Sequence, residues 1–296
     1  MHFTNSTWAD LPWTEWVRFS DVQAFKKLPA SAGVYRVRPV GVQELFYIGQ
    51  TGRDLRERLR DLRSNTLQEV MPFNDPHTAA PSLWAWRHAE GFAFECSVAP
   101  VQLAEDEEEA RRLREGLEFY LLWLYRLEFG SSTRCNHGRF HPRYRKSTDR
   151  KKGVRGDRIP DNNPSNPAGG PSLPPLPLLP SPVDERWMGL TWHPVLPLQP
   201  PVVKTVGRGP GVYKILDSEK KQLLYIGESQ DLRDRLLQHV KKSWQRCAPQ
   251  FSFVRLPEDT PGYQRREIEN DLLGGFYAQT RQIPTFQLLN HRQLSI

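Results

Sequence analysis

Two stretches of the sequence decide the fold: GVYRVRPVGVQELFYIG at residues 33–49 and GVYKILDSEKKQLLYIG at residues 211–227. Each contains two short runs rich in β-branched and aromatic residues, separated by a turn. This pattern predicts a β-hairpin in each stretch. If each hairpin is regular about Gly41 or Glu219, its two tyrosines lie side by side on one face of the sheet.

The two hairpins belong to a repeat. Gly-Val-Tyr and Tyr-Ile-Gly recur at an offset of 178 residues, and Asp54–Leu59 recurs as Asp231–Leu236 at an offset of 177. Upstream, Leu11-Pro12-Trp13 corresponds to Leu190-Thr191-Trp192. Identical residues in the same order indicate an internal duplication, with a period far longer than that of a solenoid.

Each copy continues with further elements of an α/β unit. A helix capped by Asp54 or Asp231 follows the hairpin. We expect third strands at 92–96 and 251–254 and long helices at 105–127 and 264–277. The prediction is an α/β (α+β) fold with two copies of a small three-stranded antiparallel sheet flanked by helices.

Length and composition indicate a soluble intracellular protein. The 296 residues suggest two domains at roughly 150 residues each. Three cysteines cannot form a disulfide framework, which favours a reducing, cytoplasmic location. We find no signal peptide at the N-terminus and no apolar run near the ~20 residues of a membrane span, so no membrane association is expected.

A basic segment and a proline-rich segment separate the two copies. Residues 134–158 hold ten Lys or Arg against two Asp, whereas the whole chain carries only +7. Residues 162–183 have no charge and frequent prolines, which predicts an extended spacer or, less strongly, a ligand for proline-recognition domains. The predicted domains are 1–142 and 188–296, joined by a basic and then proline-rich linker at 143–187.

The basic segment is a candidate nucleic-acid contact. Clustered positive charge is typical of proteins that bind the phosphate backbone, and the alternative is a solvated linker. The candidate DNA-binding residues are Arg143, Arg145, Lys146, Lys151 and Lys152.

The residues around the hairpins suit phosphodiester hydrolysis. Each hairpin brings two phenols to the start of an arginine-rich helix, and Arg235 and His239 are four residues apart on one helix face. Arginine binds phosphate with a planar donor fork. A carboxylate that holds Mg²⁺ commonly neutralises developing charge, and Glu118 and Glu269 on the long helices are the candidates.

The motif closely resembles that of the GIY-YIG nuclease superfamily: Gly-Val-Tyr, eleven residues, Tyr-Ile-Gly, then Leu-Arg-x-Arg-Leu. The resemblance covers roughly residues 10–140 and 188–292. It implies a three-stranded antiparallel sheet flanked by helices. It also implies cleavage of nucleic acid, usually DNA, with one divalent metal ion, Mg²⁺ or Mn²⁺, and without a small-molecule cofactor.

For the second half, the resemblance implies roles for nearly every motif residue. Tyr213 resembles the tyrosine that positions or deprotonates the attacking water, and Tyr225 resembles its partner. Arg235 resembles the phosphate-binding arginine, and His239 the histidine that assists proton transfer. Glu269 resembles the metal ligand, with Glu267 as the alternative in another helix register. Asn290 fits the order of the closing asparagine, although the usual Pro-x-x-Asn spacing leads from Pro284 to Gln287.

For the first half, the resemblance implies Tyr35, Tyr47 and Arg58 as catalytic residues, Glu118 as metal ligand and Asn136 as the closing asparagine. Leu62 stands where the second half has His239. His77 and His88, in the extra segment after the helix, are possible but disfavoured substitutes.

Cys135, His137 and His141 have the spacing of three zinc ligands, but no paired CxxC accompanies them. We therefore favour ordinary residues of a nucleic-acid-contacting segment over a zinc site.

Three functions are compatible with these residues. The leading hypothesis is a restriction-like DNA endonuclease in which two catalytic units in one chain act as a pseudo-dimer and cut both strands of double-stranded DNA. On this hypothesis one chain suffices as a monomer. The alternatives are a structure-specific or repair nuclease that nicks with one active half, and a catalytically silent nucleic-acid-binding module.

Overall fold

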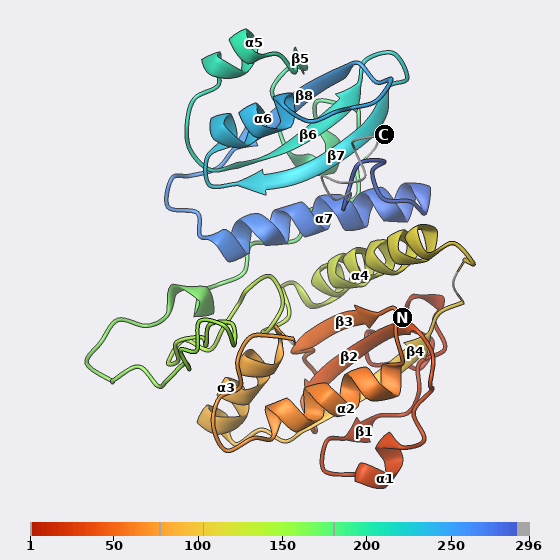
Figure 1. Ribbon diagram of the computed structural model, residues 1–296, viewed down its shortest axis with the longest axis vertical. Coiled ribbons are helices and arrows are strands. Elements are labelled where there is room, and N and C mark those ends of the chain that lie inside the picture. The colour runs from red at the N-terminus through yellow and green to blue at the C-terminus, as the bar shows by residue number, and fades with distance from the viewer. Residues whose placement is uncertain (1, 77, 103, 180, 289–296) are drawn as a thin grey trace. The chain divides into compact units, whose positions relative to one another are not determined.

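The chain forms two compact units, Met1–Ser172 and Leu173–Ile296, each described here by itself (Figure 1). The structure is a computed structural model that describes all residues except 1, 77, 103, 180 and 289–296. In the described part of the chain, no helix combines the length and the apolarity that crossing a bilayer requires.

Unit 1 is built on one antiparallel sheet with strand order β1-β4-β2-β3. The hairpin strands are β2 (Gly33–Pro39) and β3 (Tyr47–Thr51), with β4 (Phe94–Pro100) beside β2 and β1 (Val17–Arg18) at the edge. The helices are α1 (Val22–Phe25), α2 (Leu55–Thr66), α3 (Ala80–Glu90) and α4 (Glu107–Phe129). Side chains from α2 and from β2 share one buried cluster, which fixes the helix on the sheet.

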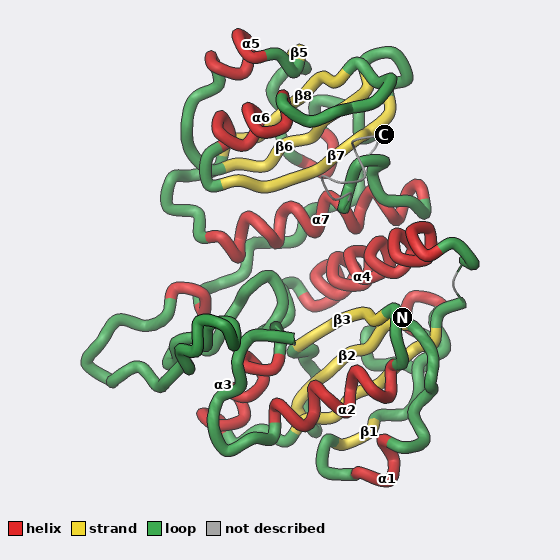
Figure 2. The backbone as a smooth tube through the Cα atoms, in the orientation of Figure 1, coloured by secondary structure: helices red, strands yellow, loops and turns green. Residues whose placement is uncertain are grey.

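Unit 2 repeats this arrangement with strand order β5-β8-β6-β7. Its strands are β5 (Leu196–Pro197), β6 (Gly211–Asp217), β7 (Gln222–Ser229) and β8 (Pro249–Arg255). Its helices are α5 (Pro200–Thr205), α6 (Leu232–Val240) and α7 (Gly262–Thr280). Figure 2 shows a hairpin, a helix, a strand and a long helix in this order in both units, with α3 as an additional helix before the strand in unit 1.

The prediction of a mixed α and β fold is confirmed, but the three-stranded sheets are wrong in detail, because each sheet has four strands. The fourth strand is only two residues long and pairs with the edge of β4 or β8. A two-residue strand has no alternating pattern of its own. It pairs with a strand about 55 to 80 residues further along the chain. Sequence periodicity does not indicate such a distant pairing.

The register of each hairpin also differs from the expectation. Tyr35 pairs with Gly49 and Val37 with Tyr47, while Tyr213 pairs with Gly227 and Ile215 with Tyr225. The two tyrosines are therefore diagonal neighbours on the same face rather than directly opposite. Their ring centroids are 5.9 Å apart in unit 1 and 6.0 Å in unit 2, within reach of aromatic contact.

A tryptophan pair with a buried cation recurs in both units. Trp13 Nε1 donates to the Trp8 carbonyl over 2.9 Å, and Trp192 Nε1 donates to the Trp187 carbonyl over 3.0 Å. The Arg36 guanidinium lies 4.2 Å from the Trp13 ring centroid. The Lys214 ammonium lies 4.4 Å from the Trp192 ring centroid. The repeat thus extends beyond the hairpin to the packing behind it.

The units differ most between α2 and β4 of unit 1, which correspond to α6 and β8 of unit 2. Equivalent residues are offset by 177 at Asp54 and Asp231 but by 151 at Glu118 and Glu269, so unit 1 is longer here. The extra residues include α3, which begins with a proline in its first turn and ends at Gly91 in the left-handed conformation. This helix was not expected from the sequence.

The proline-rich segment is not an isolated spacer. The N–H groups of Leu173 and Leu176 donate over 2.9 Å to the buried carboxylates of Glu267 and Asp271 on α7. Because proline has no N–H, the few other residues of this segment supply its backbone donors. From Leu173 onward, the segment therefore follows α7 as part of unit 2.

Candidate active site

In unit 2, the phenol of Tyr213 is the centre of a polar cluster. Tyr213 is buried in β6, and its hydroxyl lies 2.7 Å from Nε2 of His239. Arg235 Nε donates to the same hydroxyl over 3.2 Å. Since Arg235 is a donor only, the phenol accepts from it and can give its own proton to His239 Nε2. This is a ready path for proton transfer.

The helix α6 sets the spacing of these two groups. The Asp231 side chain accepts from the N–H of Asp234 and so fixes the first turn of the helix. Arg235 and His239 follow one turn apart and reach the same phenol. The Trp244 indole donates to the His239 carbonyl over 3.0 Å, which holds the C-terminal end of this turn.

Tyr225 completes the aromatic wall of the site. Its ring stacks on Tyr213 and lies 4.8 Å from the His239 ring. Burial raises the pKa of both tyrosines, with Tyr225 adding to the effect at Tyr213. The Lys242 ammonium lies 5.1 Å from the Tyr225 ring, and burial lowers its pKa. Lys242, which no sequence motif indicated, adds a second cation beside Arg235.

The glycine of Tyr-Ile-Gly makes room for the first tyrosine. A Cβ on Gly227 would come within 2.4 Å of the Tyr213 hydroxyl, and a Cβ on Gly49 within 2.7 Å of the Tyr35 hydroxyl. Any side chain here would displace the phenol from its arginine. The motif glycine is therefore a requirement of the tyrosine position rather than of a turn.

Glu269 brings a carboxylate to the site from α7. The side chain is half-buried, and burial together with the neighbouring Glu228 raises its pKa to about 7, against the lowering effect of Arg235. The alternative ligand Glu267 is fully buried and instead binds the Leu173 N–H.

Unit 1 reproduces part of this cluster. Arg58 Nε donates to the Tyr35 hydroxyl over 3.2 Å, as Arg235 does to Tyr213. Tyr47 lies beside Tyr35, and burial raises the pKa of both. Glu118 is half-buried, and burial raises its pKa to about 8. The proton path differs, because the apolar Leu62 is packed in the core where unit 2 has the histidine.

A further pair of residues, missed by the sequence analysis, links the long helix to the hairpin in each unit. Arg265 Nε binds Glu228 Oε2 at 2.7 Å, and Arg114 Nε donates to Gln50 Oε1 over 3.2 Å. Arg114 and Arg265 have the same offset of 151 residues as Glu118 and Glu269, and Gln50 and Glu228 have the same offset of 178 as the hairpin motifs. These shared offsets could have indicated that the two pairs are equivalent.

The residue expected as the closing asparagine binds the backbone of the hairpin. The Asn136 amide donates to the Ile48 carbonyl over 2.8 Å and accepts from the Ile48 N–H over 3.0 Å, so it holds the strand that carries Tyr47. In unit 2 the Gln287 amide makes the same two bonds to Ile226, each of 3.1 Å. Gln287 is thus the structural counterpart, as the Pro-x-x spacing hinted. Asn290 lies outside the described residues.

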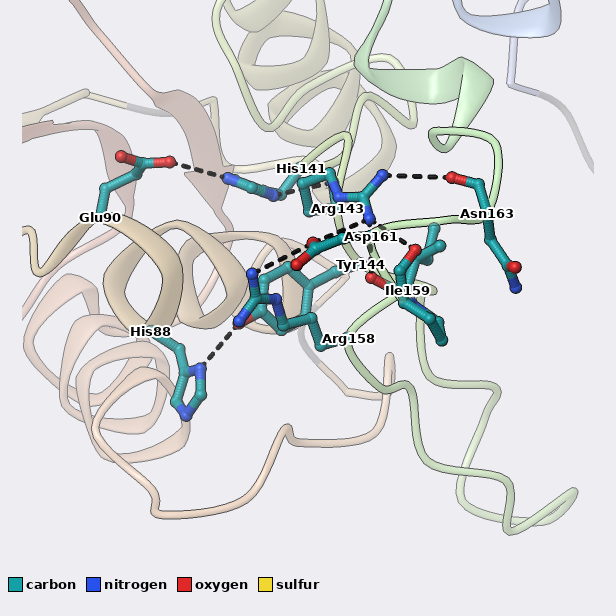
Figure 3. A network of polar contacts seen from close by, with 10 residues as sticks. His88, Glu90, His141, Arg143, Tyr144, Arg158, Ile159, Asp161 and Asn163 are labelled. Atoms are coloured by element: carbon teal, nitrogen blue, oxygen red, sulfur yellow. Dashed lines mark hydrogen bonds and ion pairs between the residues drawn. The ribbon is translucent and has the colours of Figure 1, made fainter.

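The basic segment packs against the rest of unit 1, and Figure 3 shows the polar contacts near its two ends. Arg143 donates from its guanidinium to residues that directly follow the basic segment, namely the carbonyls of Ile159, Pro160 and Asn163 and the Asp161 carboxylate. These hydrogen bonds connect Arg143 to the chain that follows Arg158. The role of Arg143 as a phosphate contact stays a prediction, because these hydrogen bonds are largely exposed.

The other candidate cations of the segment are on its surface. Arg145, Lys146, Lys151 and Lys152 are exposed, with Arg145 3.8 Å from Asp157 and Lys152 3.6 Å from Asp149. Exposed ion pairs of this kind contribute little, roughly 0–1 kcal/mol, so phosphate can compete for these side chains.

The histidines near this segment have other partners. His88 Nδ1 lies 2.8 Å from the Tyr144 hydroxyl, and His141 Nε2 lies 3.2 Å from Glu90. Cys135 is part of the apolar core. Across the residues that the structure describes, no group of three or more His, Cys, Asp or Glu side chains is arranged to hold a metal ion. His77 lies outside those residues.

The donor set of each site nevertheless fits Mg²⁺. This ion is commonly bound through one or two carboxylates, with water and substrate phosphate completing its octahedral shell. Glu118 and Glu269 each provide one half-buried carboxylate whose pKa is raised, chiefly by burial.

Comparison with known proteins identifies one part of the chain. Residues 209–268 match the family model of the GIY-YIG catalytic domain. The match covers the hairpin, α6 and β8 and ends one residue before Glu269. Neither the curated proteins nor the solved structures include a significant match to the chain. The matched domain is one of nucleases.

Proposed function

We propose that the protein is a metal-dependent DNA endonuclease in which two GIY-YIG units of one chain each hydrolyse a phosphodiester bond. On this proposal unit 1 is a second copy of the catalytic domain and the two units cut opposite strands, as a pseudo-dimer in a monomeric chain. The role is restriction of foreign DNA. The observation that carries it is the tyrosine hydroxyl held by a helix arginine in both units, at 3.2 Å each time.

The residues of unit 2 account for the steps of hydrolysis. Arg235 binds a phosphate oxygen with the guanidinium nitrogens not used for Tyr213, and Lys242 adds a second positive charge. The Tyr213 oxygen takes a proton from the attacking water as its own proton moves to His239 Nε2 over the 2.7 Å hydrogen bond. The cation held by Glu269 would neutralise charge on the phosphate in the transition state.

Unit 1 has the same phosphate and metal groups but a different route for the proton. Arg58, Tyr35 and Glu118 correspond to their counterparts in unit 2, whereas Leu62 cannot accept a proton. Tyr35 must then pass its proton to water. We therefore propose that both units are active and that unit 1 is the slower one.

DNA binding is proposed to depend on the exposed cations of the basic segment. Arg145, Lys146, Lys151 and Lys152 contact the phosphate backbone, and Arg143 keeps the segment folded. Double-stranded DNA is the expected partner because a duplex presents closely spaced phosphates to such a cluster.

A plasmid assay tests the proposal. Supercoiled DNA incubated with the protein and Mg²⁺ should become nicked and then linear, and chelation should stop both steps. Glu269→Gln and Glu118→Gln should each leave a nicked product. No cleavage by the wild type under any divalent metal would refute the nuclease proposal.

The second candidate is a nicking nuclease with one active unit, and Leu62 is the observation that favours it. On that hypothesis, substitutions in unit 1 weaken binding without changing which strand is cut. End-labelling of each strand distinguishes the two functions.

A further inference from the structure

A short ion pair in unit 2 joins the helix of the candidate metal ligand to the hairpin of the tyrosines. Glu228 follows Gly227 directly on β7, and Arg265 lies one helical turn before Glu269 on α7. Arg265 Nε binds Glu228 Oε2 at 2.7 Å, and its Nη1 donates to the Thr260 carbonyl over 2.7 Å. The side chains are only 9% and 19% exposed.

Unit 1 has the same connection without the negative charge. Gln50 follows Gly49 directly, and Arg114 lies one turn before Glu118. The bond from Arg114 Nε to Gln50 Oε1 is 3.2 Å long. The guanidinium packs against Gly52, where a Cβ would come within 2.4 Å of it. The geometry is conserved between the units, and the charge is what differs.

The Glu228–Arg265 pair lies close to Glu269, the carboxylate proposed to bind the metal. A helix is stiff over one turn. Because Arg265 is bonded to Glu228 on β7, this bond also fixes where Glu269 lies relative to Tyr225 on the same strand. Besides burial, Glu228 itself influences the pKa of Glu269, since its carboxylate raises that pKa and its backbone N–H lowers it. Glu228 is therefore an immediate electrostatic neighbour of Glu269.

We propose that Glu228 and Arg265 are positioning residues for the divalent cation of unit 2, and that their counterparts in unit 1, the neutral Gln50 with Arg114, make unit 1 the weaker cation site. Glu228 compensates the charge of Arg265, which would otherwise repel a cation next to Glu269. In unit 1 the charge of Arg114 is not compensated by Gln50. This inference rests on the proposed function, because it takes Glu118 and Glu269 as the cation ligands.

Mn²⁺ binding to the full-length protein without DNA tests the proposal directly. Electron paramagnetic resonance counts free Mn²⁺ and so gives the dissociation constant of each site. Glu118→Gln isolates the site of unit 2, and Glu269→Gln isolates that of unit 1. In the first background Glu228→Gln should weaken Mn²⁺ binding about tenfold, or about 1.4 kcal/mol. In the second, Gln50→Glu should strengthen it severalfold.

The controls separate positioning from general effects. Glu219→Gln removes one charge from the exposed turn of the same hairpin and should leave the dissociation constant unchanged. Glu228→Gln recreates the Arg–Gln pair that unit 1 already accommodates, so the fold should tolerate it. Gln50→Glu provides an independent gain-of-binding test if Glu228→Gln does not fold.

The outcomes distinguish this proposal from the proposed function. If Glu228→Gln binds Mn²⁺ as tightly as Glu219→Gln does, or if Gln50→Glu brings no gain, the positioning role is refuted. If the double variant Glu118→Gln with Glu269→Gln keeps all Mn²⁺ binding, the assignment of the metal ligands itself is refuted, and with it this part of the proposed function.

Discussion

The two units hold the first tyrosine of the hairpin in the same way but surround it with different residues. In both, a helix arginine donates over 3.2 Å to a buried tyrosine hydroxyl. Among the described residues, that hydroxyl meets a histidine in unit 2, at 2.7 Å, whereas Leu62 takes the place of His239 in unit 1. The comparison shows that the arginine–tyrosine contact is common to both copies, while the residue one helical turn after the arginine differs.

The largest expected effect comes from removing the arginine that both units share. Arg235→Ala should slow cleavage of one strand by roughly 10²–10³, because the guanidinium no longer stabilises the developing charge. Arg58→Ala should do the same to the other strand. Strand-specific end-labelling measures both rates. Arg60→Ala, an exposed arginine on the same helix as Arg58, serves as the control and should change neither.

If a variant of either unit still linearises plasmid DNA at low protein concentration, the model of two sites with one strand each is wrong. If Arg58→Ala changes only the affinity for DNA, unit 1 is a docking unit and the nicking function applies.

Exchanging the histidine and the leucine should make the units more alike. His239→Leu should slow cleavage by unit 2 by about 10², a typical contribution of acid–base catalysis. Leu62→His should raise the rate of unit 1, provided that the new ring reaches the Tyr35 hydroxyl. Single-turnover rates on end-labelled duplexes are the measurement. Equal rates for His239→Leu and the wild type would show that the histidine carries no proton.

The two carboxylates proposed to bind the metal should lose that binding at different pH values. The pKa of Glu269 is raised to about 7 and that of Glu118 to about 8, mainly by burial. A carboxylate binds a cation only when ionised, so binding is lost as the pH falls through the pKa. Near the lower of these values, unit 2 should bind Mn²⁺ several times more tightly than unit 1.

Mn²⁺ titrations of Glu118→Gln and Glu269→Gln between pH 6 and pH 9, a range chosen to bracket both carboxyl groups, measure this separation. Competition by the metal moves both curves to lower pH but keeps their order. If the curves of Mn²⁺ affinity against pH coincide for the two variants, the predicted separation is wrong.

The smallest effect is expected from the basic segment, which has no counterpart in unit 2. Neutralising the exposed Arg145, Lys146, Lys151 and Lys152 should lower the slope of log K against log salt by up to about 0.9 for each phosphate that is no longer neutralised. Arg143→Ala should instead loosen residues 143–163 and increase their cleavage by protease. Fluorescence anisotropy of a labelled duplex gives the slope. An unchanged slope would make the segment a structural feature only.

Much of each unit follows from local sequence. The hairpins, the capped helices and the long helices are indicated by strand propensity, by Asp54 and Asp231, and by apolar periodicity, all of which act over a few residues. The catalytic motif could be recognised because Tyr213, Arg235 and Glu269 keep their order and spacing. The same local signals did not indicate α3 or the short edge strands β1 and β5, which depend on the rest of the sheet.

The sequence by itself determined the repetition of the fold and the kinds of side chain that meet in each site. Tertiary structure alone decided which of them touch. It set each tyrosine pair in a diagonal register, gave Gln287 the place of the closing asparagine, bonded Arg143 to residues 159–163 and paired Arg265 with Glu228. The reason is physical: local propensities act along a few residues, whereas register, burial and charge pairing depend on elements that only packing brings together.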